Sequence, residues 1–64
     1  MMEQMKQYLR NGAYTVEELA VMCDMFPQAA YTALEYLIVH DGAHLADAAT
    51  EGAKRWTMMV EGRQ

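Results

Sequence analysis

The sequence lacks the paired cysteines of exported proteins and the long apolar runs of membrane proteins. Its 64 residues include one cysteine, Cys23, and one proline. No apolar run approaches the roughly 20 residues that a membrane-spanning helix needs. A single cysteine excludes an internal disulfide and is typical of the reducing cytoplasm. We therefore predict a cytoplasmic protein without a membrane span.

Positive charge is scarce as well. Five Lys and Arg stand against nine Asp and Glu, which gives a formal net charge of -4 at pH 7. Lys6 and Arg10 precede residue 13, Lys54, Arg55 and Arg63 follow residue 51, and every charge between them is acidic. Nucleic acids attract proteins mainly through Lys and Arg. A nucleic-acid surface would therefore have to be assembled from the two ends of the chain.

The sequence also lacks the features of an enzyme. A chain of this length buries only about 60% of its unfolded surface, which leaves little room for a catalytic cleft. His40 and His44 are separated by the helix-ending pair Asp41-Gly42, so they do not share a helical face as paired metal ligands do. No Gly-rich phosphate loop or nucleophile elbow occurs. We predict one domain over residues 1–64 that is not an enzyme and takes no metal or cofactor.

The first segment with helical character runs to about residue 11. Its apolar residues recur at steps of three and four, at Met1, Met2, Met5, Tyr8 and Leu9. Asn11-Gly12 can adopt the left-handed conformation in which helices commonly end. Residues 13–14 should then be extended. The methionines are expected mainly in the core, and Met1, Met2 and Met5 offer self-association into a homodimer as an alternative.

The second helix begins with a capping box. Thr15 and Glu18 have the spacing at which each side chain bonds the backbone amide of the other residue. This helix is expected to run to about Asp24, with Cys23 as a small buried hydrophobic residue.

The third helix is predicted from Pro27 to His40, because proline suits the first helical position and Asp41-Gly42 ends the pattern. Its inward face is predicted to contain Ala30, Leu34, Leu37 and Ile38. Tyr31, Tyr36 and Val39 should face outward.

Two strands are predicted after Gly42, over residues 43–46 and 54–60, with a loop at 47–53 and a frayed polar tail at 61–64. Strand alternation places Trp56 and Met58 inward, and Arg55, Thr57 and Met59 outward. The alternative architecture is a helical bundle with a disordered tail, but the apolar run from 56 to 60 favours the hairpin.

The order of three helices and a hairpin resembles a winged helix-turn-helix domain, of the small bacterial or phage type. Residues 15–20 are similar to the opening of the second helix in this family, and residues 31–37, closed by Asp41-Gly42, are similar to its third helix. The resemblance covers nearly the whole chain, with residues 43–60 as the wing. It implies an α+β fold.

The resemblance also implies a DNA-binding transcriptional regulator, with the third helix in the major groove and the wing on the backbone. Gln28 and Thr32 would contact base edges, Tyr31 a phosphate, and Lys54 and Arg55 the DNA backbone. Other interpretations are a solvated helix face for Gln28 and Thr32, and a strand edge protected from aggregation for Lys54 and Arg55.

The alternative function is an acidic winged-helix adaptor or inhibitor that binds a protein and no nucleic acid. The third helix lacks the Lys and Arg that DNA-binding members carry, and Glu35 would face DNA phosphates with like charge. Tyr31, Tyr36 and Val39 would then contact a protein partner.

Overall fold

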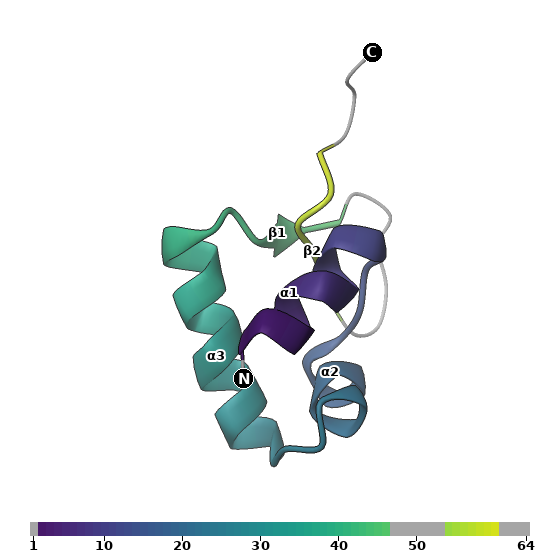
Figure 1. Ribbon diagram of the computed structural model, residues 1–64, viewed down its shortest axis with the longest axis vertical. Coiled ribbons are helices and arrows are strands. Elements are labelled where there is room, and N and C mark those ends of the chain that lie inside the picture. Colours follow the sequence, from purple (N-terminus) through teal and green to yellow (C-terminus); the bar gives the residue numbers. More distant parts are fainter. Residues whose placement is uncertain (1, 47–53, 61–64) are drawn as a thin grey trace.

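The computed structural model describes residues 2–46 and 54–60. It contains three helices followed by a two-stranded antiparallel hairpin, which confirms the α+β class (Figure 1). The elements are α1 (Met2–Asn11), α2 (Val16–Met22), α3 (Pro27–His40), β1 (His44–Leu45) and β2 (Trp56–Thr57). Helix α2 packs against α3, and α1 contacts β2. Met1, the predicted loop at 47–53 and the predicted tail at 61–64 lie outside the described residues.

Helix α1 ends at Asn11, as predicted, but not by the predicted left-handed turn. Neither Asn11 nor Gly12 has a positive φ. Instead, the Asn11 side-chain amide donates to the Gln7 carbonyl at 2.8 Å and satisfies a group in the last turn. Gly12 has a different use: a Cβ at this position would lie 2.8 Å from the Tyr14 hydroxyl oxygen. The glycine therefore makes room for the Tyr14 ring.

The predicted capping box at the start of α2 is confirmed. The Glu18 amide donates to Thr15 Oγ1, and the Thr15 amide donates to Glu18 Oε1, both at 3.0 Å. The helix ends at Met22, two residues earlier than predicted, because Asp24 adopts the left-handed conformation with φ 58°.

Two further hydrogen bonds close the end of α2. The Met25 amide donates to the Ala20 carbonyl at 2.9 Å, and the Asp24 amide donates to the Val21 carbonyl at 3.2 Å. This pair of bonds is the Schellman motif, in which a left-handed residue lets the chain reverse direction. The reversal leads directly into Pro27, the first residue of α3.

Helix α3 has the predicted bounds, and its end is set by Gly42. The amides of Asp41 and Ala43 both donate to the Leu37 carbonyl, at 2.9 and 3.1 Å, while Gly42 has φ 82°. A residue with a side chain rarely adopts this backbone conformation, so glycine is well suited to the turn from α3 into β1.

The inward face of α3 is narrower than predicted. Ala30, Leu34 and Leu37 are buried, at helical steps of four and three. Ile38, which was expected inward, is 37% exposed. It lies one residue beyond Leu37, about 100° further round the helix, and so leaves the buried stripe. The predicted outward positions Tyr31, Tyr36 and Val39 are confirmed as exposed.

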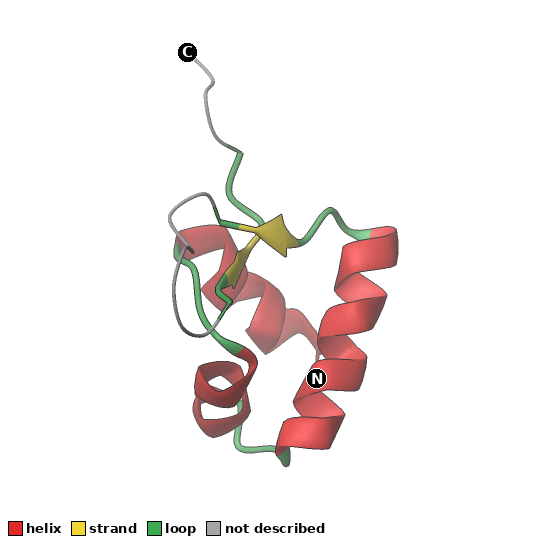
Figure 2. Cartoon of the chain, turned by 180° about the vertical axis from the view of Figure 1, so that it is seen from behind, coloured by secondary structure: helices red, strands yellow, loops and turns green. Residues whose placement is uncertain are grey.

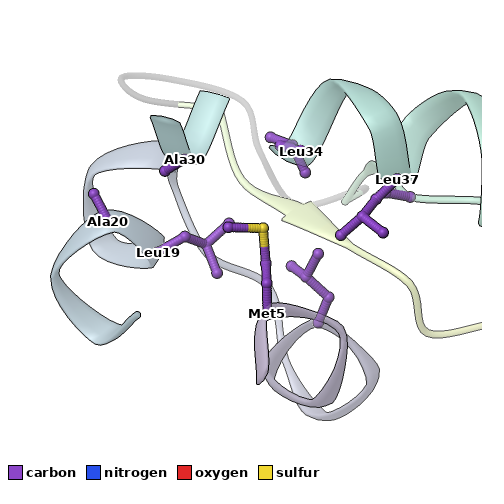
Figure 3. Close-up of a cluster of buried hydrophobic side chains, with 8 residues drawn as sticks. Met5, Leu19, Ala20, Ala30, Leu34 and Leu37 are labelled. Atoms are coloured by element: carbon purple, nitrogen blue, oxygen red, sulfur yellow. The ribbon is translucent and has the colours of Figure 1, made fainter. Parts of the chain in front are cut away.

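All three helices contribute to the buried core, which Figure 3 shows in close-up. Its members are Met5, Leu9, Leu19, Ala20, Ala30, Leu34, Leu37 and Ala43. The Met5 side chain extends from α1 into the middle of this group (Figure 3). Met2 and Cys23 are partly buried against it. A flexible thioether suits this position because it can fill the irregular space between helices.

The strands are shorter than the predicted ranges. His44 pairs with Thr57, and Leu45 pairs with Trp56. On its other side, Trp56 exchanges two backbone hydrogen bonds with Tyr14, at 2.8 and 2.9 Å. The extended segment predicted at residues 13–14 therefore joins the hairpin through Tyr14, and Trp56 lies between two partners.

One strand position was predicted on the wrong face. Thr57, expected outward, is 3% exposed, while Trp56 and Met58 are partly buried against the core. The Thr57 hydroxyl lies 2.8 Å from the Gly12 carbonyl oxygen and 3.1 Å from that of Leu9. Alternation fails here because regular pairing ends at Thr57, and the chain turns to satisfy carbonyl groups at the end of α1.

Candidate interaction surface

Three of the predicted DNA-contacting residues line one surface hollow of about 550 Å³. They are Gln28 and Tyr31, from the first turns of α3, and Lys54, which precedes β2. The other lining residues are Val16, Glu17, Pro27 and Trp56. Figure 2 shows α2, α3 and the hairpin, which supply these residues. The hollow forms because the Schellman turn sets the start of α3 against α2, while the Tyr14 pairing fixes Trp56 nearby.

The other two predicted DNA-contacting residues have different surroundings. The Thr32 hydroxyl donates to the Gln28 carbonyl at 3.1 Å, within α3. Arg55 Nη1 donates to Glu18 Oε1 at 3.0 Å and lies 3.4 Å from the Ala13 carbonyl oxygen. Neither residue lines the hollow. Arg55 therefore links the hairpin to the capping box of α2 and has its charge partly neutralised there.

A second hollow, of about 360 Å³, continues along α3. It is lined by Tyr31, Leu34, Glu35, Ile38, Val39 and Trp56. Tyr31 and Trp56 are walls of both hollows. We call the two together the Tyr31–Trp56 groove. Ile38 and Val39 give it an apolar surface. Ile38, which was predicted in the core, therefore lines the groove instead.

The groove is bordered by carboxylates. Glu17 lines the first hollow and Glu35 the second. Both are exposed, and within residues 2–46 and 54–60 neither forms a salt bridge. In the part of the chain that the structure describes, Lys54 is the one basic residue that lines these hollows. The groove is therefore apolar in its middle and carries a net negative charge.

Apolar surface continues beyond Glu17. A third hollow, of about 410 Å³, is lined by Tyr14, Glu17, Glu18, Val21 and Met22. Val21, which lines this hollow, is 81% exposed. This side of α2 adds exposed apolar residues and a further carboxylate next to the groove.

The two basic residues of α1, Lys6 and Arg10, do not line the groove. Lys6 Nζ lies 3.7 Å from Asp41 Oδ2 and 3.9 Å from Glu3 Oε2. Arg10 is exposed in the last turn of α1. The charge of Lys6 is paired with two acids, which reduces what this residue could add to a DNA surface.

The two histidines and the cysteine are held by contacts within the fold. The imidazole of His40 stacks on the Tyr36 ring at a centroid distance of 4.2 Å, whereas His44 Nδ1 lies 2.8 Å from the Gly42 carbonyl oxygen. Burial raises the pKa of the Cys23 thiol, which leaves less of the reactive thiolate at neutral pH. The part of the chain that the structure describes contains no group of three His, Cys, Asp or Glu residues placed to hold a metal ion.

Sequence reasoning identified Gln28, Tyr31 and Lys54 but missed the role of Trp56 as a wall of the groove. One signal was present: an indole is too large for a core built mostly of Leu and Ala to cover completely. Val16 and Pro27 were not predicted at a binding surface. Their contribution depends on how α2 and α3 meet, which no local pattern reveals.

Comparison with known proteins finds no matching family model, no similar curated protein and no similar solved structure. Among the described residues, no helix combines the length and apolar character that crossing a membrane requires.

Proposed function

We propose that this protein is a cytoplasmic winged-helix module that binds another protein through the Tyr31–Trp56 groove. The order of elements, three helices followed by an antiparallel hairpin, supports the winged-helix assignment. A single cysteine supports the compartment. The groove supports the binding role.

The observation that carries the proposal is that two hollows meet at two aromatic side chains, Tyr31 on the exposed side of α3 and Trp56 in β2. Tyr31 is 53% exposed, and Val39, on the same helix, is 74% exposed. Protein interfaces gain much of their energy from aromatic anchors and from apolar side chains that fill pockets. A partner side chain placed between Tyr31 and Trp56 would contact aromatic anchors and fill a pocket at the same time.

Charge favours a protein over DNA at this surface. Glu17 and Glu35 would face phosphates with like charge, and Arg55 is already paired with Glu18. DNA affinity depends strongly on the number of cations that reach phosphates. Helix α3 has no Lys or Arg to supply them.

A photo-crosslinking amino acid at position 31 tests the proposal, with the same replacement of Tyr36 as the matched control. Both tyrosines are exposed on α3, but Tyr36 does not line the groove. In cells that make the protein, position 31 should crosslink to a discrete protein, and position 36 should not. Equal crosslinking from both positions would contradict the proposal.

The captured protein is then purified and titrated against the intact chain. Trp56 is the only tryptophan, so its fluorescence reports on the groove directly. We expect a saturable change in emission that Tyr31→Ala weakens by about tenfold or more and Tyr36→Ala leaves unchanged. A titration that Tyr31→Ala leaves unaltered would place the partner elsewhere.

Duplex DNA is the second candidate partner, because Gln28, Tyr31 and Lys54 line one hollow. In this alternative α3 enters the major groove, with the Gln28 amide against a base edge. Labelled duplex is titrated at low and at physiological salt. Binding that weakens with salt and again in Lys54→Ala would favour DNA. Arg55→Ala is a poorer test, because it also breaks the bond to Glu18.

A further inference from the structure

We infer that the partner's docking segment is cationic as well as apolar: Lys or Arg side chains on it pair with Glu17 and Glu35 while an apolar side chain lies between Tyr31 and Trp56. This inference rests on the proposed function and specifies the partner's chemistry. It follows from the positions of the charges along the groove.

The two carboxylates flank the aromatic pair along the groove. Glu17 lines the first hollow, and Glu35 lines the second, which continues along α3 beyond Tyr31 and Trp56. A segment that follows the groove therefore passes one carboxylate, the aromatic pair and then the other carboxylate. Opposite charges at these positions would fix both its register and its direction.

The neighbouring charges do not neutralise this pattern. Glu18, in the adjoining third hollow, is paired with Arg55. Among the described residues, Lys54 is the single cation that lines the groove, and it lies in the first hollow with Glu17. Within residues 2–46 and 54–60, Glu35 is the only charged residue that lines the second hollow. The strongest preference for a cation on the partner is therefore expected at the Glu35 end.

Apolar surface and negative charge together exclude several occupants. An acidic segment would be repelled by Glu17 and Glu35. A purely apolar segment would cover these carboxylates without pairing them, and removing an unpaired charge from water is unfavourable. A basic segment without an apolar anchor would leave the space between Tyr31 and Trp56 unfilled. Only a segment with both properties matches the whole groove.

The test uses a random-peptide library displayed on phage, selected against the intact protein. Selected peptides are then synthesised and titrated by Trp56 fluorescence. We expect sequences with an aromatic or large aliphatic residue flanked by Lys or Arg. The double variant Glu17→Gln/Glu35→Gln should weaken their binding by about tenfold, since two exposed ion pairs are lost.

The control variant Glu3→Gln/Asp41→Asn removes the same amount of negative charge at residues that line none of the three hollows, and it should bind as the original protein does. Glu18 is left intact in both variants because it completes the capping box. Lys54→Ala should leave the binding of a cationic peptide unchanged or strengthen it. The same change would weaken the binding of duplex DNA, so the two partners give opposite results.

The outcomes separate the inference from the proposed function. Peptides that bind, lose affinity in Tyr31→Ala and carry acidic or neutral flanks would overturn the inference and leave the groove as a protein-binding site. Peptides whose binding Tyr31→Ala does not weaken would overturn both. Equal losses in the groove variant and the control variant would show a general charge effect and overturn the inference.

Discussion

Thr57 shows how much one small side chain can connect in this molecule. Its hydroxyl lies within hydrogen-bond distance of the Leu9 and Gly12 carbonyl oxygens and accepts from the Met59 amide at 3.1 Å. The Leu9 carbonyl also accepts from the Met58 amide at 2.9 Å. The loss of the hydroxyl would therefore affect the Gly12 carbonyl most, because Leu9 keeps a second partner.

Thr57→Val tests this role. The substitution retains the shape of the side chain and removes its hydroxyl, and we expect a loss of about 1 to 2 kcal/mol in the free energy of unfolding. Urea denaturation followed by circular dichroism measures it. Thr57→Ser keeps the hydroxyl and should lose less. A valine variant as stable as the original would show that the Gly12 carbonyl finds another partner.

Gly42 gives a second prediction at the same scale. Its φ of 82° is unfavourable for residues with a side chain, yet a Cβ at this position would meet no atom within 4 Å. Gly42→Ala therefore isolates the backbone conformation from steric clash, and we expect a loss of about 1 kcal/mol. Gly42→Asn should lose less, because asparagine tolerates this conformation better. Equal unfolding midpoints for the original protein and the Gly42→Ala variant would contradict the positive φ assigned to this position.

At the scale of elements, α2 depends on its ends more than on its length. It has seven residues, and helices of this size are not stable by themselves. The capping box satisfies its first amides, the Schellman motif its last carbonyls, and Arg55 ties Glu18 to the segment that precedes β2. These bonds fix the orientation in which α2 presents Val16 and Glu17 to the groove.

Thr15→Ala removes the cap of α2. We expect the free energy of unfolding to fall by about 1 kcal/mol, because the Glu18 amide loses its acceptor and Thr15 is buried. Thr15→Ser is the matched control and should remain close to the original. Amide hydrogen exchange in the first turn of α2 should accelerate in the alanine variant alone. Unchanged exchange there would mean that the cap contributes nothing to the helix.

The whole molecule is held by a small core. Leu34 is 1% exposed and lies among the buried residues of all three helices. Chains of this size have a free energy of unfolding of only about 3 to 10 kcal/mol. Truncating one central side chain therefore removes a large share of the total free energy of unfolding.

Leu34→Ala is expected to remove about 2 to 5 kcal/mol, through lost burial and the cavity that remains. The melting temperature followed by circular dichroism should fall by about 10 °C or more. Val39→Ala on the exposed side of the same helix should change it little. Similar melting temperatures for the two variants would contradict the placement of the core.

Local chemistry explains which parts of the fold were predictable. Thr15 with Glu18, Pro27 and Gly42 each act through bonds that span six positions or fewer, so the bounds of α3 and the start of α2 follow from short patterns. The presence of the hairpin also follows from the composition of the last part of the chain. The ends of its strands were set too wide, because pairing stops where the chain turns toward α1.

The errors and omissions involve partners far away in the sequence. Thr57 is buried by carbonyl groups 45 and 48 positions earlier, and Arg55 meets Glu18 across 37 positions. Ile38 is exposed because the residues opposite α3 cover only a narrow stripe. The groove itself requires Trp56 to lie near Tyr31, and Trp56 is placed by its pairing with Tyr14. None of these contacts leaves a periodic signal.

The bond from Met58 to Leu9 has a consequence for the order of folding. The carbonyl groups that end α1 accept from a segment nearly fifty positions later, so they gain these partners only after a long loop has closed. The docking of residues 57 and 58 on the end of α1 is thus expected late in folding. Opening at the Met58 amide should accompany disruption of the entire tertiary structure rather than fraying of one strand.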